Sequence, residues 1–575
     1  MEIAGGRLCL EGRSTEDEHL DFDNEDAVKG KIAELEDTVR EYQYRIEHLR
    51  MSLNRFGPTH RLPNEILALI FGYCVMEGRT PDTHTKPKWL GFTAVCRYWR
   101  VVALNTPALW TTPHFHNGGL ALAMVERSYP LPMAIDAHIS LWTTRGVRVA
   151  LQKIFQQAFR ISHLRLSIRS GTNLNNLLPE HSLQEPAPLL RVMELHITPR
   201  DGVHSHSFKI PKDMWGRTAP NLKHLSLRGC YIDNSSPLLR NLTYLHLDMR
   251  TSHRAVNYKR LVSHVPLLEH LELCIGTRMS DPANESAVQL RHLKHFYLCG
   301  DMLGCAFLLN QFSYPDSTSI HVEVMFMKCQ ARFQVDNVFL IFLSSLSVFI
   351  PLQPRIRSLL IEGYDEEWMQ LKGWASPSGA SMLEDLTSMK PQLCLSFNHP
   401  HREHRPTWDN VLYGVLSSPL RASIEALECL SFRTDSRLFK APLKTILQCF
   451  GNHPVLHTIE LLDYLHPAAV TALGDDTSLG RAPLGAFQTL WQDMPSAELY
   501  AGMSFPKLRT LYLEGIHLAD SDAPTNAFNA LLGSLRFRMP YDLTVELVLT
   551  KDCDLDTKQV RSMEEVAVRV RCLDP

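Results

Sequence analysis

The side chains best suited to chemistry in this sequence are clustered histidines. The segment HPHREHRPTWDN (399–410) contains His399, His401, Glu403 and His404, and imidazole and carboxylate groups are common zinc ligands. The nearby prolines, the lack of cysteine and the missing H-E-x-x-H order favour a solvated loop over a metal site. The segment HSHSF (204–208) is interpreted in the same way.

Motifs for phosphate binding or covalent catalysis are missing from the sequence. It contains neither a G-x-x-x-x-G-K loop nor a G-x-S-x-G nucleophile elbow. We therefore expect no catalytic residue, no metal and no cofactor, and a protein that is not an enzyme. An enzyme that uses the histidine cluster is the weakest alternative.

Composition excludes several classes of partner. The 575 residues are 45% hydrophobic and 21% charged, with a net charge of -3, which is typical of a globular protein and offers no bulk attraction to nucleic acid or anionic membranes. The apolar run VFLIFLSSLSVFIPL (338–352) contains three serines and stops at Pro351, so we expect buried core there. The first residues lack a signal-peptide pattern, and the thirteen cysteines form no C-x-x-C pair, which favours the cytoplasm, the nucleus or both.

The N-terminal region predicts a disordered acidic tail (1–27) followed by a heptad helix (28–55). Apolar residues recur at spacings of four and three, as a narrow helical seam requires; they are Val28, Ile32, Leu35, Val39, Tyr42, Ile46, Leu49 and Leu53. β-branched residues at the first core position favour a parallel pair of helices. Two interpretations remain open: a homodimer through 28–53, or a single helix packed on the next domain.

A compact helical domain is predicted over 58–115. In LPNEILALIF (62–71), Pro63 is placed as the first helical residue. Ile66 and Ile70 share one helix face with Tyr73 and Cys74, whereas Leu67, Phe71 and Val75 point away from it. This helix must therefore be covered on both sides. A second helix is predicted within the segment 89–110, where Pro107 ends it.

A repeating pattern begins near residue 160. Short segments of alternating leucine and polar residues recur, with key positions at Leu164, Leu195, Leu225, Leu245, Leu271 and Phe296, separated by 31, 30, 20, 26 and 25 residues. These periods match leucine-rich repeats, in which each strand needs its neighbours to bury its apolar face. The fold class predicted for the whole chain is α/β: the heptad helix, a small all-helical module, and an irregular leucine-rich-repeat-like solenoid over 160–575.

The exposed position in each strand segment gives a set of candidate target contacts on the concave strand face. They are Ser226, His246, Glu272, Tyr297, Glu460 and Tyr512. A register error of one residue would turn every one of them to the other face.

The segments LPNEILALIF and VCRYWRVVALNTPALW resemble an F-box, a helical module with leucine-proline, glutamate and isoleucine-phenylalanine in its first helix and valine-cysteine-arginine, tryptophan and leucine-tryptophan after it. Together with the leucine-rich segments, the chain resembles the F-box proteins abundant in fungi. Its connection between Phe71 and Trp89 is longer than is usual in the family. The resemblance implies docking on the Skp-type adaptor of an SCF, or cullin-RING, ubiquitin ligase. It assigns Leu62, Pro63, Ile66, Ile70, Phe71, Val95 and Trp99 to the adaptor interface or to positions immediately behind it.

Two functions follow as expectations. In the first, the protein is a substrate receptor whose repeats hold an unidentified protein target while other subunits perform the chemistry. In the second, it is a scaffold or regulator that dimerises through the heptad helix and does not enter a ligase. A competing structural interpretation is that the F-box residues are simply the core of their own module.

Overall fold

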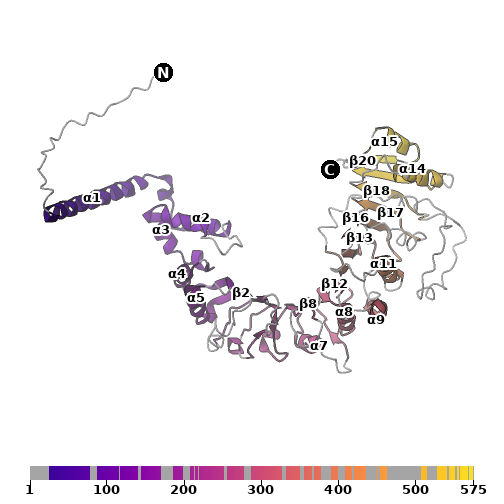
Figure 1. Cartoon of the computed structure of the whole chain (residues 1–575), viewed down its shortest axis with the longest axis horizontal. Helices are drawn as coiled ribbons and strands as arrows, with labels where there is room; N and C mark the ends of the chain where they lie inside the picture. Colours follow the sequence, from indigo (N-terminus) through magenta and orange to yellow (C-terminus); the bar gives the residue numbers. More distant parts are fainter. Residues whose placement is uncertain are drawn as a thin grey trace, which may run out of the picture. The chain divides into compact units, whose positions relative to one another are not determined.

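The computed structural model (Figure 1) describes most of the chain from residue 25 onward. The ranges outside the description are 1–24, 78–86, 116, 140–143, 170–184, 199–207, 213, 218, 251–255, 277–285, 327–331, 350–354, 366–367, 377–389, 399–407, 418–419, 435–449, 451–452, 463–504, 506, 515–526, 540–542, 551–552, 554, 556, 568 and 574–575. The predicted tail (1–27) therefore lies almost wholly outside the described residues, as do the histidines of 204–206 and 399–404. The chain divides into two compact units, of which the first comprises Met1–His116 and Leu120–Leu131.

The first unit is helical. Its elements are α1 (Glu25–Asn54), η1 (Pro58–Arg61), α2 (Asn64–Glu77), η2 (Lys88–Ala94), α3 (Arg97–Leu104), η3 (Pro107–Trp110) and α4 (Gly118–Arg127). α2 packs against η2, α3 and η3, and their apolar side chains form one core. No residue of α1 is buried.

The single helix predicted within 89–110 is wrong, because the segment forms three short elements. Cys96 separates η2 from α3 in an extended conformation, with φ -158° and ψ 168°. Its Sγ accepts a hydrogen bond from the Trp99 N–H at 3.5 Å, which satisfies one of the unpaired donors at the start of α3. Pro107 then begins η3. The helical spacing of the apolar residues in the sequence continues across these breaks, because the 3₁₀ helices η2 and η3 wind in the same sense as the α-helix α3.

The second unit is a large mixed α/β region built on one sheet, which has sixteen strands in the described residues. In chain order these are β1 (Met133–Ile139), β2 (Ile161–Arg169), β3 (Val192–Thr198), β5 (His224–Arg228), β7 (Tyr244–Asp248), β8 (His270–Cys274), β10 (His295–Gly300), β12 (Ser319–Met325), β13 (Ser358–Asp365), β14 (Trp368–Trp374), β15 (Leu393–Asn398), β16 (Cys429–Thr434), β17 (Thr458–Leu462), β18 (Thr510–Glu514), β19 (Glu546–Thr550) and β20 (Arg569–Leu573). Two short parallel pairs, β4 (Phe208–Lys209) with β6 (Cys230–Tyr231) and β9 (Val288–Gln289) with β11 (Phe312–Ser313), stand apart from it.

The strands follow one another across the sheet in parallel, except at one inversion. The order β12-β15-β14-β13-β16 runs backwards in sequence, and β14 is antiparallel to both neighbours. The sheet also begins at β1, earlier than the predicted residue 160, because the β1 segment MAIDAHI alternates alanine and isoleucine in place of leucine. Within the pattern, Leu164 pairs with Met193 and not with Leu195, a two-residue offset that leaves the buried face unchanged.

Helices and short turns connect the strands. They are α5 (Arg145–Phe155), η4 (Ala158–Arg160), η6 (Met214–Arg217), η7 (Pro237–Leu239), α7 (Tyr258–Val262), α8 (Met302–Leu309), α9 (Arg332–Phe349), α11 (Trp408–Ser417), α14 (Ala527–Arg538) and α15 (Thr557–Glu564). α8 contacts β10, β12 and α9, and α8, α9, α11 and α14 lie on the same side of the strands (Figure 1). The opposite face of the sheet carries the polar side chains and is called the polar face below.

The apolar run at 338–352 forms much of α9. Val338, Phe339, Phe342, Leu343 and Leu346 are buried, as expected for a helix that packs against its neighbours. Within the described ranges, none of the helices combines the length and apolar character needed to cross a membrane.

Candidate functional site

Helix α2 separates its apolar residues into two sets. Leu67, Phe71 and Val75, spaced four residues apart, are buried in the unit's core. Their neighbours on the other side are exposed by 41% to 69%; they are Ile66, Leu69, Ile70, Tyr73 and Met76. A run of large apolar side chains left in water on a well-packed helix is typical of a protein-binding surface. We call these five residues the α2 face.

An aromatic core holds the α2 face in place from behind. The ring of Phe71 stacks on Phe92 with centroids 4.2 Å apart, and lies 5.2 Å from Trp99. The Trp110 Nε1–H donates to the Ala103 carbonyl oxygen at 2.9 Å, so this buried indole has its partner. Because these rings are fixed by packing and hydrogen bonding, α2 presents its outer face on a rigid support.

The start of α2 is fixed by a tyrosine from α3. The Tyr98 hydroxyl lies 2.9 Å from both the Leu62 carbonyl oxygen and the Asn64 Oδ1. The Pro63 carbonyl oxygen accepts the first intrahelical bond, from the Leu67 N–H at 3.1 Å. Pro63 is therefore the residue just before the helix, one position earlier than predicted, and it is exposed.

The structure places the seven predicted adaptor-binding residues in two layers. Pro63, Ile66, Ile70 and Val95 are exposed, and Leu62 is half-buried. Phe71 is 1% exposed and belongs to the core, while Trp99 is half-buried against it. Phe71 and Trp99 can therefore support an interface only by packing beneath the exposed residues.

Sequence reasoning omitted three residues of the α2 face from the predicted site. Leu69, Tyr73 and Met76 are exposed by 61%, 69% and 65%. Tyr73 shares the predicted helix face of Ile66 and Ile70, so the helical wheel contained the signal for it. Leu69 and Met76 lie toward the edge of that face, where the wheel alone did not separate inside from outside.

A second candidate surface is the central row of the polar face. Strand pairing brings one residue from each strand into register across the sheet; in sheet order they are Asp136, Arg165, Glu194, Ser226, His246, Glu272, Tyr297, His321, Cys394, Lys372, Leu360, Ser431, Glu460, Tyr512, Val548 and Arg571. All six residues predicted to contact a target lie in this row. Their role in target binding stays a prediction.

None of those six residues is as exposed as expected, because four are half-buried and two are buried. Ser226 is 4% exposed and hydrogen-bonded to the His246 Nδ1 at 2.8 Å. Glu460 is 2% exposed, and its carboxylate accepts a hydrogen bond from the Ser431 hydroxyl at 2.5 Å. Burial raises the pKa of Glu460, because a buried carboxylate is poorly solvated. The Ser226 hydroxyl also lies 3.3 Å from the His196 Nε2, so the larger side chains of both neighbouring strands contact this small residue.

Charges on the polar face are arranged in pairs toward its first strands. Arg165 donates to Glu194 at 2.7 Å and lies 3.4 Å from Asp136. The hydrogen bonds from Arg165 lower the pKa of Glu194. Asp248 is contacted by Arg228 at 3.0 Å and by Arg250 at 2.8 Å. Much of this charge is thus balanced within the sheet.

Metal binding has no support in the described ranges, where no group of three or more potential ligands comes together. The predicted cluster at 399–404 lies outside those ranges, so the structure does not test it.

Comparison with known protein families finds a match to part of the helical unit. The F-box-like family matches residues 59–116, which include α2, α3 and the aromatic core. Domains of this family generally bind Skp-type adaptors. No curated protein matches the chain.

Proposed function

We propose that this protein is the substrate-recognition subunit of an SCF-type cullin-RING ubiquitin ligase. The observation that carries the proposal is the α2 face: five large apolar side chains exposed on the F-box-like domain. The Skp-type adaptor would cover this face and connect the chain to the cullin scaffold. Catalysis would then arise from holding a target close to the ubiquitin-charged enzyme, with no catalytic residue in this chain.

The proposed interface would need only a few apolar anchors. Stable protein interfaces bury roughly 1,600 Å² in total, and their energy is concentrated in a few central anchors. Ile66 and Ile70 are suited to be such anchors, because they are apolar, exposed by 43% and 41%, and one helical turn apart. Leu62, Pro63 and Val95 would extend the contact, and Phe71 and Trp99 would support it from behind.

The sheet would supply target recognition as an irregular leucine-rich-repeat-like solenoid. Successive parallel strands joined by helices or turns, each with its apolar residues in register, support this interpretation. Half-buried polar residues of the central row, including His246, Glu272, Tyr297 and Tyr512, would contact the target. The free thiols among the described cysteines fit the cytoplasm or the nucleus, where ligases of this kind would act.

The test is capture of a purified Skp-type adaptor by the full chain. We expect the wild-type chain to capture it, and the double variant Ile66→Ala, Ile70→Ala to lose at least about tenfold in affinity, because two anchors are removed. The matched control is Val149→Ala on α5, an aliphatic residue of similar exposure, 43%, in the second unit. Failure of a folded wild-type chain to bind would overturn the proposal.

A scaffold that dimerises through α1 is the second candidate. The heptad residues Ile32, Val39 and Ile46 are exposed by 51%, 53% and 47%, so within the described residues nothing covers the seam. Adaptor capture discriminates between the two functions: a chain that dimerises but does not bind the adaptor would be a scaffold.

A further inference from the structure

Four aromatic rings form a ladder on the polar face, at the beginning of consecutive strands of the sheet. They are His224 (β5), Tyr244 (β7), His270 (β8) and His295 (β10), and strand pairing places them in one row. The His224 and Tyr244 rings stack at 3.9 Å, and those of His270 and His295 at 4.6 Å. Stacking holds the His270 and His295 rings side by side at one place on the sheet.

The ladder ends at a hollow of about 410 Å³ between β8, β10, β12 and β15. Its lining is more apolar than polar, and the residues that could bind a polar ligand there are His270, Glu272, His295, Tyr297, His321 and Lys390. This volume lies within the range of sites that take a small ligand or a short piece of a peptide.

Most of the charged groups around the hollow already have partners. Lys294 donates to Glu269 at 2.6 Å, the Tyr297 hydroxyl donates to Glu323, and His321 is hydrogen-bonded to Ser396 at 3.0 Å. Lys390 is exposed, and it makes no ion pair with any residue of the described ranges. Among the described residues, the rim of the hollow therefore presents one cation without an ion pair, Lys390, beside two stacked imidazoles.

The two imidazoles make the charge of the hollow depend on pH. Burial, followed by the nearby charge of Lys390, lowers the pKa of His270. Burial and then the neighbouring His270 lower the pKa of His295. The other titratable and charged groups facing this pair or the adjoining His321 are Tyr244, Glu269, Glu272, Lys294, Glu323 and Lys372. An anion bound between Lys390 and the rings would offset the lysine's effect and favour protonated imidazoles.

We propose that this hollow receives a carboxylate from an acidic segment of a protein target. The inference rests on the proposed function for the existence of a target, and on charge complementarity for its chemistry. Lys390 would supply the ion pair, and His270 and His295 would donate hydrogen bonds that become charge-assisted when the rings gain protons. Glu272 also lines the hollow, so we expect one carboxylate of the acidic segment to enter it while the other acidic side chains of the segment stay outside.

The experiment measures binding of fluorescein-labelled hexaglutamate to the full chain by fluorescence anisotropy, at constant ionic strength. We expect saturable binding at pH 6.0, about tenfold tighter than at pH 7.5 because binding is linked to roughly one proton. Lys390→Gln should weaken binding about three- to fivefold, the size of an exposed ion pair, and Lys390→Arg should restore it. Labelled hexalysine should not bind.

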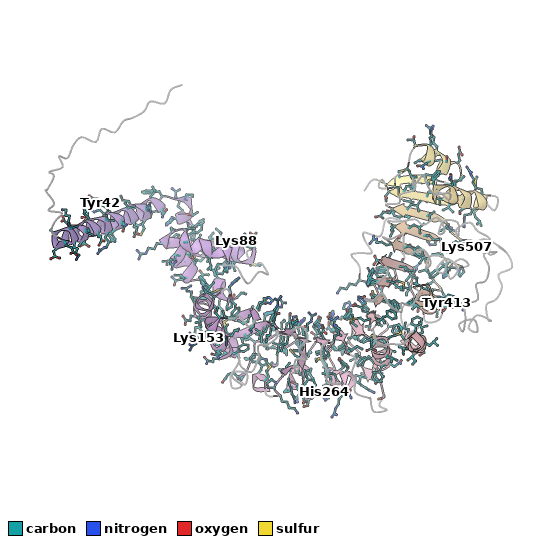
Figure 2. The ribbon with its side chains drawn as sticks, viewed as in Figure 1. Tyr42, Lys88, Lys153, His264, Tyr413 and Lys507 are labelled. Carbon is teal, nitrogen blue, oxygen red and sulfur yellow. The ribbon has the colours of Figure 1, made fainter. Side chains whose placement is uncertain are left out.

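The matched control is Lys507→Gln, because Lys507 is also exposed and also stands three residues before its strand (510 - 507 = 393 - 390 = 3) (Figure 2). Its loss should leave hexaglutamate binding unchanged. A second arm uses His270→Gln with His295→Gln, which should remove the pH dependence while leaving some binding through Lys390.

Three results would overturn the inference: no hexaglutamate binding by the folded wild-type chain at pH 6.0, equal binding after Lys390→Gln, or tighter binding at pH 7.5. The outcome is separable from that of the proposed function, because the adaptor is absent from the assay. The Ile66→Ala, Ile70→Ala variant should bind hexaglutamate as the wild type does. If it does so while the wild-type chain fails to capture the adaptor, only the ligase assignment falls.

Discussion

At the scale of single residues, Ile70 and Phe71 are neighbours in sequence with opposite roles. Ile70 is 41% exposed, whereas Phe71 is 1% exposed and stacked on Phe92. The helical wheel separated them correctly, because helical geometry alone sets the angle between adjacent side chains. The family pattern could not separate them, because it records both as required residues without stating whether each serves the core or a partner.

This contrast gives a prediction for stability. Phe71→Ala should destabilise the F-box-like unit by about 3–5 kcal/mol, since it leaves a cavity in an aromatic core. Ile70→Ala should change stability by less than about 0.5 kcal/mol, as an exposed substitution does. Chemical denaturation of the full chain, followed by tryptophan fluorescence, measures both. Equal destabilisation by the two variants would mean that Ile70 is also a core residue.

At the scale of elements, α1 carries an apolar seam that no other described residue covers. Its seam residues from Ile32 to Leu53 are exposed by 47% or more, and Tyr42 projects from the helix (Figure 2). Side-chain pairs such as Arg45 with Glu41, 2.6 Å apart, support the helix along its length. Such pairs add only a few tenths of a kcal/mol, so a helix of this kind gains most from burying its seam.

A second copy of the helix is the partner that the heptad pattern predicts. Val39→Asp should shift the full chain from dimer to monomer in sedimentation equilibrium, because it places a charge in the buried seam. Tyr44→Asp is the control: Tyr44 is 69% exposed but lies outside the heptad positions. A wild-type chain that is monomeric at all accessible concentrations would contradict the dimer.

Strands were predictable where leucine alternates with polar residues, and not elsewhere. Alternation found β5, β7, β8 and β10 because their pattern reports directly on one buried face. It missed β1, and it could not foresee that β14 runs antiparallel between β13 and β15. That order depends on pairing between strands distant in the chain, for which a local pattern contains no signal.

At the scale of the whole molecule, the sheet should make stability depend on pH. Burial lowers the pKa of six histidines on its polar face: His196, His224, His246, His270, His295 and His321. The unfolded chain, whose histidines titrate near 6.5, therefore binds more protons than the folded one as the pH falls below that value. The stabilisation that these six neutral histidines contribute is therefore fully present above pH 6.5, and it is lost as the pH falls below that value.

Thermal melting of the full chain tests this expectation. The melting temperature should fall between pH 7.5 and pH 5.5, and the slope should be smaller in the variant His246→Gln, His321→Gln. Carboxylates with lowered pKa values, such as Glu194, would act only at more acidic pH. The buried Glu460, with its raised pKa, acts in the opposite sense. A melting temperature that is constant over this range would contradict the prediction.

The inversion at β13–β15 has a consequence for synthesis on the ribosome. Strands up to β12 can each pair with the strand made just before them, so the sheet can grow as the chain emerges. The outer edge of β12, however, pairs with β15, whose first residue, Leu393, follows Met325 by 68 residues (393 - 325 = 68). Until that stretch has been translated, the nascent chain carries an open strand edge, which is where newly made sheet proteins aggregate and where chaperones are needed.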